Sequence, residues 1–433
     1  MNLASPFSVA LLTILALSLL GFPVGLSMVG GTVLYLFLAG LDVGTASEQI
    51  INGMMGSFLL LAIPLFILAA EFMNAGSIMD RLVRFCNAVV GRFRGGLALV
   101  NVAQSIIFAS MSGSALADAA GAGKLMQSLM TREGKYPKAF ASALTAVSAV
   151  IGPILPPSIP LVVYSLISDA SVGYLFLAGV VPGLLIGAVQ AILIVLVAKR
   201  RNFPLEEKVP LREMPRITWQ AFPALMMPVI LFGALYSGIT TPTEAAALAA
   251  AYALLISAVL YRSVTAGGIY HSLITSARTT VSIGMLIAGA MAFNYVITVE
   301  NIPKTVSAIL TATELSPFGF LLMVNLILLV LGCLLEGTTI ILVILPVLLP
   351  TATALGIDPV HFGVLAVTNI MFGLVTPPYG LLLFMMARIS DLPMRDIVRE
   401  VMPFLGVMFI ALMIITYVPD FVLFLPRMFG YSG

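Results

Sequence analysis

Two proline pairs lie in matching surroundings, Gly152-Pro153-Ile154-Leu155-Pro156-Pro157-Ser158 and Gly373-Leu374-Val375-Thr376-Pro377-Pro378-Tyr379, each inside an apolar run. Proline has no backbone N–H and its ring clashes with the preceding helical turn, so an adjacent pair leaves carbonyl groups that hydrocarbon cannot solvate. Both stretches therefore predict an interrupted membrane helix. Such backbone is tolerated at membrane depth only where it is buried in protein or lines a water-filled cavity.

The composition indicates a membrane protein. Hydrophobic residues make up 60% of the chain, charged residues 9%, and the mean hydropathy is +1.12, whereas soluble domains contain roughly 25% charged residues. Within residues 139–198 Asp169 is the only Asp, Glu, Lys or Arg. Strand-like alternation of apolar and polar residues is absent, so we expect an all-α polytopic membrane protein rather than a barrel.

The basic residues predict which loops face the cytoplasm, because Lys and Arg concentrate on that side. They form four groups along the chain: Arg81, Arg84, Arg92 and Arg94; Lys124, Arg132, Lys135 and Lys138; Lys199, Arg200, Arg201, Lys208, Arg212 and Arg216; Arg388, Arg395 and Arg399. The net charge of +2 by itself says little about partners.

The first two basic groups predict a re-entrant hairpin over residues 95–123. A helix near 57–79 leads to the basic loop 81–94, and the next basic loop, 124–138, must lie on the same side of the membrane. The segment between them is too short for two crossings, which need roughly 40 residues. We expect the hairpin to turn at Ser112-Gly113-Ser114.

A second hairpin is predicted over 317–355, entering from the opposite side. Its midpoint carries Glu336-Gly337-Thr338-Thr339 and no Lys or Arg. Two full crossings joined by a tight Glu-Gly turn are the alternative, with the same sidedness. Each hairpin precedes a proline-broken helix, 139–168 in the first half and 360–387 in the second. Paired interruptions in two halves are typical of the inverted-topology repeats of secondary transporters.

This pattern divides the chain into four parts. We expect N-terminal scaffold or arm helices over 1–44, a first repeat over 45–198, a cytoplasmic linker with scaffold or arm helices over 199–261, and a second repeat over 262–433. The apolar N-terminal stretch predicts either one long tilted helix or two short helices hinged at Gly21-Phe22-Pro23.

Hairpin tips and helix breaks expose hydroxyl and carbonyl oxygens that coordinate small cations, and N–H groups that attract carboxylates. Two sodium sites are predicted from the residues that surround the tips and breaks: Ser110, Ser112, Gly113, Ser114, Gly152 and Pro153 in the first half, and Gly337, Thr338, Thr339, Gly373, Thr376 and Pro377 in the second. The alternative is that these small residues only allow close helix packing.

Two carboxylates fall within the hairpins. Asp118 follows the first tip and Glu336 forms the second. An intramembrane carboxylate is a candidate for function by default, although either residue could instead cap a hairpin helix. His271 and His361 stand near the ends of predicted spans without further ligands beside them, so we expect no metal centre other than sodium sites.

Four segments together resemble a known family: Ser112-Gly113-Ser114-Ala115-Leu116-Ala117-Asp118, Ile151–Ser158, Glu336–Thr339 and Gly373–Pro378. They are similar to the large, DctM-like membrane subunit of tripartite ATP-independent periplasmic (TRAP) transporters, over essentially the whole chain. The resemblance implies an elevator-type transporter of a bacterial inner membrane, in which sodium drives import of an organic acid such as a sialic acid or a dicarboxylate.

The resemblance also implies partners and a place for the substrate. A periplasmic binding protein would deliver the acid, and a separate small four-helix membrane subunit would accompany this chain; no nucleic acid and no cofactor beyond Na⁺ is expected. The substrate would lie between the two tips. Its candidate contacts are Ser114, Asp118, Pro156, Pro157, Thr339 and Pro378.

Two other functions fit parts of the pattern. A sodium- or proton-coupled symporter or antiporter that needs no binding protein would share every hairpin feature. An intramembrane hydrolase using Ser112 or Ser114 would need a general base, and no histidine or paired-aspartate pattern supplies one at membrane depth. No phosphate-binding loop of the Walker type occurs in the sequence, which argues against ATP as the direct energy source.

Overall fold

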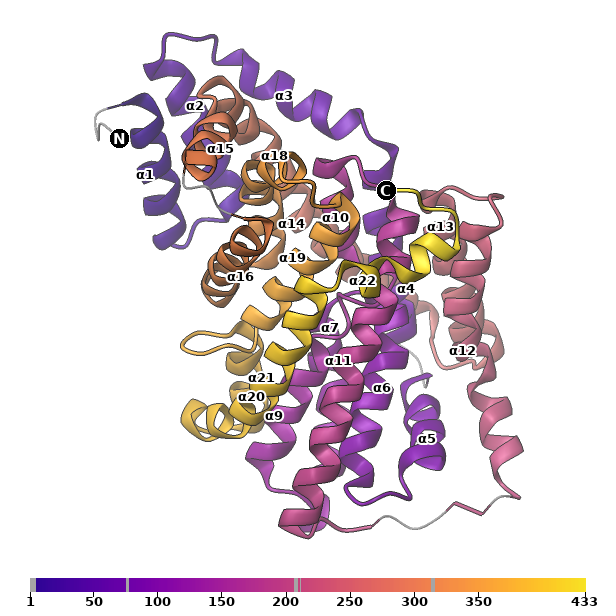
Figure 1. The fold of residues 1–433 in the computed structure, drawn as a ribbon. Coiled ribbons are helices and arrows are strands. Elements are labelled where there is room, and N and C mark those ends of the chain that lie inside the picture. Colours follow the sequence, from indigo (N-terminus) through magenta and orange to yellow (C-terminus); the bar gives the residue numbers. More distant parts are fainter. Residues whose placement is uncertain (1–4, 75–77, 206–208, 211, 313–315) are drawn as a thin grey trace.

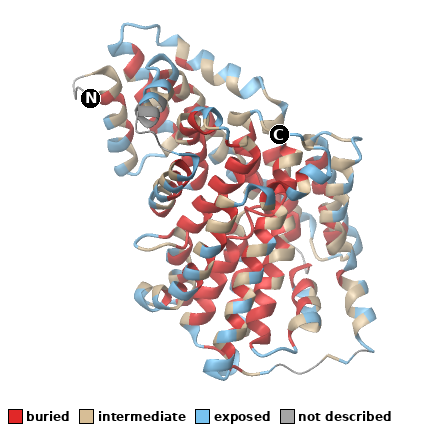
Figure 2. Cartoon of the chain, in the orientation of Figure 1, coloured by how far each residue is buried: buried red, intermediate tan, exposed pale blue. Residues whose placement is uncertain are grey.

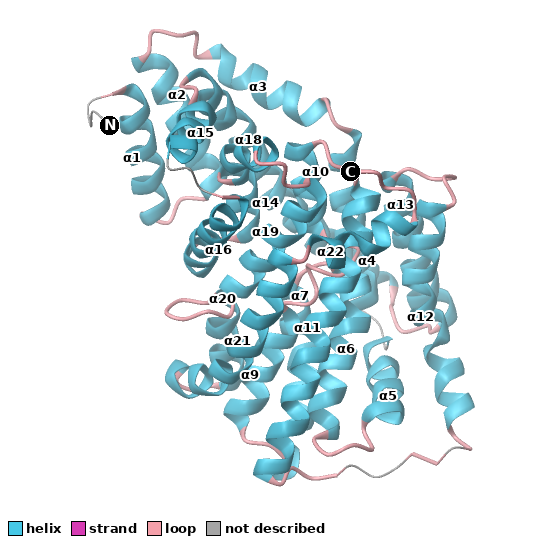
Figure 3. Ribbon diagram, in the orientation of Figure 1, coloured by secondary structure: helices cyan, strands magenta, loops and turns pink. Residues whose placement is uncertain are grey.

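The computed structural model describes residues 5–74, 78–205, 209–210, 212–312 and 316–433, which form helices joined by turns (Figures 1 and 3). No strand occurs in these ranges, and the predicted all-α class is confirmed. Six helices of the described chain are long and apolar enough to cross a membrane: α11 (Val172–Arg201), α12 (Met214–Tyr236), α13 with its continuation (Pro242–Leu260), α14 (Ala266–Val299), α16 (Pro317–Leu334) and α21 (Met394–Tyr417).

Two bent helix pairs extend this set to eight if each pair counts as one span. The helix α3 (Gly44–Met55) meets the segment Phe58–Asn74, which contains α4 (Ala62–Asn74), at 70°. The helices α17 (Gly337–Val343) and α18 (Leu345–Ala354) meet at 55°. These assignments rest on helix length and composition.

The N-terminal stretch forms two short helices, α1 (Pro6–Leu19) and α2 (Val24–Leu38), and not one long helix. Gly21 lies between them with φ +90°, a backbone conformation that residues other than glycine rarely adopt. The glycine therefore permits the hinge. The second of the two predicted alternatives is therefore confirmed. In Figure 1 these helices and α3 lie at the upper left, beside α15 (Ile302–Ala312).

The first half contains a helical hairpin whose turn lies where it was predicted. The helix α6 (Gly96–Ser112) ends at Gly113, and α7 (Ala115–Asp118), a π-helical segment over Ala119–Gly123 and α8 (Lys124–Thr131) follow. The two arms run antiparallel, because Asn101 near the start of α6 donates to the sulfur of Met130 near the end of α8 at 3.7 Å.

Both predicted helix breaks are present. In the first half α9 (Lys138–Ala149) and α10 (Ile159–Ser168) flank the first proline pair, and in the second half α19 (Pro359–Gly373) and α20 (Leu381–Ser390) flank the other. Both Pro-Pro peptide bonds are cis. The helices before the breaks, α9 and α19, are buried along nearly their whole length (Figure 2).

Two glycines of α11 allow the backbone of the first break to pack closely on this helix. A Cβ atom on Gly179 would lie 2.4 Å from the carbonyl oxygen of Ile154, and one on Gly183 would lie 2.6 Å from Leu155 Cγ. Small residues spaced four apart let a neighbouring backbone approach a membrane helix closely. The interrupted segment is thereby surrounded by protein instead of lipid.

The two halves interlock through α10 and α19. A Cβ atom on Gly363 would lie 2.2 Å from the Tyr164 ring, so the aromatic side chain occupies the space that the glycine leaves. The Tyr164 hydroxyl donates to the carbonyl oxygen of Pro359 at 2.7 Å. Within the second half α16 crosses α19 at an equally close contact, where a Cβ on Gly373 would lie 2.3 Å from the backbone of Gly332.

Two more helices, α5 (Ile78–Val90) and α22 (Pro419–Met428), and the contacts of α21 complete the described elements that bear on the site. The helix α5 packs on α6, α21 packs on α9 and α11, and α22 packs on α11. At one end of α11, Arg201 forms an ion pair with Glu400 of α21 at 2.8 Å. These contacts join elements of both halves into one body.

A glycine substitution tests the α2–α14 crossing, where a Cβ on Gly289 would lie 2.3 Å from the carbonyl oxygen of Gly25. We predict that Gly289→Ala lowers the thermal unfolding midpoint of the detergent-purified protein, because overpacking costs roughly 1–3 kcal/mol. The control is Gly406→Ala in α21, whose Cβ meets nothing within 4 Å. That change should leave the midpoint unchanged or raise it, since alanine favours helix by up to about 1 kcal/mol. Equal effects of the two changes would contradict the packing argument.

Candidate functional site

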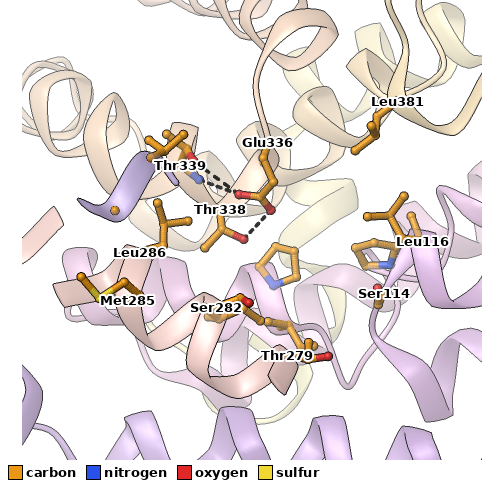
Figure 4. Close-up of a pocket in the computed structure, with 18 of the residues that line it drawn as sticks. Ser114, Leu116, Thr279, Ser282, Met285, Leu286, Glu336, Thr338, Thr339 and Leu381 are labelled. Carbon is orange, nitrogen blue, oxygen red and sulfur yellow. Dashed lines mark hydrogen bonds between the residues drawn. The ribbon is translucent and has the colours of Figure 1, made fainter. Parts of the chain in front are cut away.

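A cavity of about 580 Å³ lies between the turn at Ser112–Ser114, called the first tip, and the turn at Glu336–Thr339 between α16 and α17, called the second tip. Whether α16–α18 form a re-entrant hairpin or two crossings stays a prediction. The cavity wall combines both tips, both helix breaks, one face of α14 and the start of α2, as the close-up in Figure 4 shows in part. The lining residues are Pro23–Leu26, Gly113–Leu116, Pro153, Ile159, Pro160, Thr279, Val281, Ser282, Ile283, Met285, Leu286, Glu336–Thr339, Met371, Leu374 and Leu381. The cavity is thus mostly apolar with a few polar groups, as small-molecule sites usually are.

The first tip is shaped by Gly113, which has φ +58°. A Cβ at this position would lie 2.4 Å from the carbonyl oxygen of Pro157, so only glycine lets the tip reach the first break. Ser114 follows as the N-cap of α7, where its hydroxyl accepts a hydrogen bond from the Ala117 N–H at 3.4 Å. Ser114 therefore stands at the cavity wall with its hydroxyl oxygen in a defined orientation.

Glu336 organises the second tip by capping α17. Capping was one of the two roles predicted for this residue. Its carboxylate accepts hydrogen bonds from the Thr338 hydroxyl at 2.8 Å and from the Thr339 N–H at 3.0 Å. Figure 4 shows these bonds on one side of the cavity, with Thr279 and Ser282 of α14 on the other. The tip thus gathers a carboxylate and two hydroxyl groups at the cavity wall.

Side-chain donors form hydrogen bonds with backbone carbonyl groups at the two breaks. Ser158 caps α10, accepting from the Leu161 N–H at 3.2 Å, and its hydroxyl donates to the carbonyl oxygen of Pro153. In the second half the Cys333 thiol donates to the carbonyl oxygen of Thr376 at 3.1 Å. The Thr376 hydroxyl donates to the carbonyl oxygen of Phe372 at 2.7 Å. Each break is therefore held by a side chain from a neighbouring position.

Six of the predicted site residues line the cavity together: Gly113, Ser114, Pro153, Gly337, Thr338 and Thr339. The others stand outside this lining: Ser110, Ser112, Gly152, Pro156, Pro157, Gly373, Thr376, Pro377 and Pro378. Gly152 is nevertheless adjacent to the first tip, since a Cβ there would lie 3.5 Å from the carbonyl oxygen of Ser114. The sodium and substrate roles of all these residues stay predictions.

Asp118 also stands outside the cavity lining. Its side chain is 1% exposed and lies beside Gln104 and Ser105 of α6. It does not cap the helix that contains it, because Ser114 does so. Leu116, two residues before Asp118 in the same short helix, lines the cavity instead, as does Ala115 at the start of α7 (Figure 4 labels Leu116).

Sequence reasoning missed the wall formed by α14 and α2. Thr279, Ser282 and Leu286 follow one another at spacings of three and four residues, which places them on one helix face. The three-residue spacing of Thr279 and Ser282 in an apolar helix could have indicated a polar face at a binding site. The contribution of Pro23–Leu26 carries no such signal in the sequence.

Cysteine labelling tests whether water reaches the cavity. In a background where Cys86 and Cys333 are replaced by alanine and serine, Thr279→Cys should react with a water-soluble maleimide, because Thr279 lines the cavity and is exposed. The control is Ser148→Cys, a position that is 0% exposed. Labelling is followed by a gel shift of the purified protein, and equal rates at the two positions would rule out a water-accessible site here.

Comparison with known proteins agrees with this architecture. Residues 11–421 match the family described as the tripartite ATP-independent periplasmic transporter, DctM component. The sialic acid TRAP transporter large permease protein SiaM of Vibrio cholerae is 39% identical over 96% of this chain and 98% of its own. The C4-dicarboxylate TRAP transporter large permease protein DctM of Pseudomonas aeruginosa is 40% identical over 87% of this chain and 88% of its own.

The fold is similar to that of a solved transporter. The crystal structure of the YdaH transporter of Alcanivorax borkumensis superposes with a TM-score of 0.61, at 14% identity, over 86% of this chain and 88% of that one. The sequence relatives are permease subunits of inner-membrane transporters and not enzymes, and the resemblance stated from the four sequence segments is confirmed. The chain belongs to the DctM component family of tripartite ATP-independent periplasmic transporters, as a multi-pass large permease subunit.

Proposed function

We propose that this permease imports an organic acid by sodium symport, with the substrate bound in the cavity between the two hairpin tips. The observation that carries the proposal is that Ser114 of the first tip and Glu336–Thr339 of the second line one cavity. Segments that are far apart in the sequence thus bring hydroxyl, carbonyl and carboxylate oxygens together. A site at the junction of two repeats is typical of secondary transporters.

The charge of Glu336 supplies a physical reason for sodium coupling. An anionic substrate in the cavity would be repelled by this carboxylate, and two like charges 4 Å apart repel by about 4 kcal/mol at an effective dielectric constant of 20. A sodium ion beside Glu336 and Thr338 would cancel that repulsion. Substrate binding would then require the ion, which is the thermodynamic basis of symport.

The substrate class follows from the relatives and the size of the cavity. The Vibrio protein is named for sialic acid and the Pseudomonas protein for C4-dicarboxylates, and both substrate types carry a carboxylate. A cavity of about 580 Å³ falls within the range of roughly 300–1,000 Å³ that small-molecule sites occupy. A carboxylate-bearing acid is accordingly the proposed cargo.

An elevator movement suits the way the cavity is built. One wall consists of α14 and α2, which cross closely at Gly25 and Gly289, and the other consists of the tips and breaks. A body made of the two re-entrant hairpins and broken helices, arranged as inverted repeats, would carry the site past α14 and α2. The word tripartite in the family description suits two partners: a periplasmic binding protein and a small membrane subunit.

Uptake measurements test the proposed function. The chain is reconstituted in proteoliposomes with its small membrane subunit, and uptake of labelled sialic acid and C4-dicarboxylates is measured with and without an inward sodium gradient and the cognate binding protein. We expect uptake that requires both. Uptake without the binding protein would indicate a conventional symporter, and uptake without sodium would refute the ion sites.

A hydroxyl deletion tests the second tip. Thr338→Val keeps the branched shape and removes the oxygen that donates to Glu336. We expect the half-saturating sodium concentration for uptake to rise roughly tenfold, which corresponds to about 1.4 kcal/mol. The matched control is Thr353→Val in α18, whose hydroxyl donates to the carbonyl oxygen of Leu349 on an exposed surface. An unchanged sodium dependence in Thr338→Val would exclude this hydroxyl as part of an ion site.

A further inference from the structure

A buried polar cluster lies behind the first hairpin tip, away from the cavity lining. It consists of Asp118 of α7 together with side chains of α6 and α9, all at most 2% exposed: Asn101, Gln104, Ser105, Thr145 and Ser148. Leu116 faces the cavity from the same short helix, so the cluster and the cavity lie on opposite sides of α7. The proposed sodium sites at the tips and breaks do not include Gln104, Ser105 or Ser148.

The hydrogen bonds found among the side chains of this cluster run between groups other than Asp118. Ser105 donates to the hydroxyl of Ser148 at 3.1 Å, and Ser148 donates to Oδ1 of Asn101 at 3.1 Å. The Asn101 amide donates to the Thr145 hydroxyl at 2.9 Å. The Gln104 amide donates to the sulfur of Met79 at 3.6 Å. The hydrogen bonds therefore form a directed chain that leads away from the carboxyl group.

Three acceptor oxygens remain without a donor. Oδ1 and Oδ2 of Asp118 and Oε1 of Gln104 have no hydrogen-bond partner in the described part of the chain. The side chains of Gln104 and Ser105 lie beside the carboxyl group, yet neither makes a hydrogen bond of normal geometry with it. These three oxygens are therefore open to a further donor or to a cation.

In the described elements that pack most closely on α7, no basic side chain lies buried beside the carboxyl group. The elements packed on α7 are α6, the π-helical segment and α9. The helix α6 and the π-helical segment contain no titratable residue. The helix α9 contains one, Lys138, at its first position. Lys138 is exposed, as is Lys124, which follows the π-helical segment. A carboxylate buried without a counter-charge costs several kcal/mol, so a cation must balance it.

We propose that Asp118 binds a small monovalent cation, H⁺ or Na⁺, that travels with the first hairpin during transport. One proton on the carboxyl group would supply the donor that Gln104 Oε1 lacks, and one sodium ion would be coordinated by the same oxygens. Either cation neutralises the charge of the Asp118 carboxylate while the hairpin moves. The cation dissociates from the carboxylate when the site opens. This inference rests on the proposed transport function and adds a third coupling ion to it.

The test compares Asp118→Asn with the wild-type chain in the reconstituted complex. Asparagine keeps the size of the side chain, is permanently neutral and carries its own N–H donors. We expect the charge moved per substrate, measured from the reversal potential of uptake, to fall by one elementary charge. The control is Asp169→Asn, the same substitution at an exposed position, which should retain the wild-type charge.

Two parallel readouts identify the cation. If it is a proton, acidification of the vesicle lumen accompanies wild-type uptake and is lost in Asp118→Asn. If it is sodium, the number of radioactive sodium ions taken up per substrate falls by one in the variant and lumenal pH does not change. Equal charge per substrate in wild type and Asp118→Asn overturns the proposal, even where uptake requires sodium and the binding protein as proposed above.

A binding readout decides the case in which Asp118→Asn does not transport. The thermal unfolding midpoint of the detergent-purified chain is measured across pH and across sodium concentration. A cation held by the folded state raises the wild-type midpoint as pH falls, or as sodium increases, and Asp118→Asn should lose that part of the shift. An identical dependence in the two proteins on both pH and sodium would refute the site.

Discussion

The structure depends on one constraint: backbone carbonyl groups at membrane depth must find partners inside the protein. Each proline pair frees such groups. The Ser158 hydroxyl, five positions away in the chain, pairs with one at the first break, and the Cys333 thiol, from the distant helix α16, pairs with one at the second. Without these contacts an interrupted helix in hydrocarbon would lose several kcal/mol for each unpaired group.

Close packing on glycine is the second part of the same solution. The first break lies against Gly179 and Gly183 of α11, while α16 reaches the second broken helix at the Gly332–Gly373 contact. The first interrupted segment, 151–158, is buried throughout, whereas Pro378 and Tyr379 of the second stay exposed. The helices α14 and α2 form the facing wall of the cavity.

The features that follow from local chemistry could be predicted from the sequence. The proline pairs, the tip at Gly113 and the capping role of Glu336 each depend on a few adjacent residues. The wall from α14 and α2 could not, because it depends on the crossing at Gly25 and Gly289, which are far apart in the chain. The orientation of Asp118 was equally hidden: α7 has four residues, too few to show a periodic pattern, and its rotation is set by the turn at Gly113 and the π-helical segment that follows.

The contact between α10 and α19 has a consequence for biosynthesis. Tyr164 completes its hydrogen bond with Pro359, a residue 195 positions later in the chain, and its ring fills the space beside Gly363. During translation α10 enters the bilayer long before that partner exists. The first half consequently remains unfinished while the ribosome makes the second, with its tyrosine hydroxyl and one helix face still unmatched. Both partners arrive with α19, so the two halves of the chain can lock together only after most of it has been made.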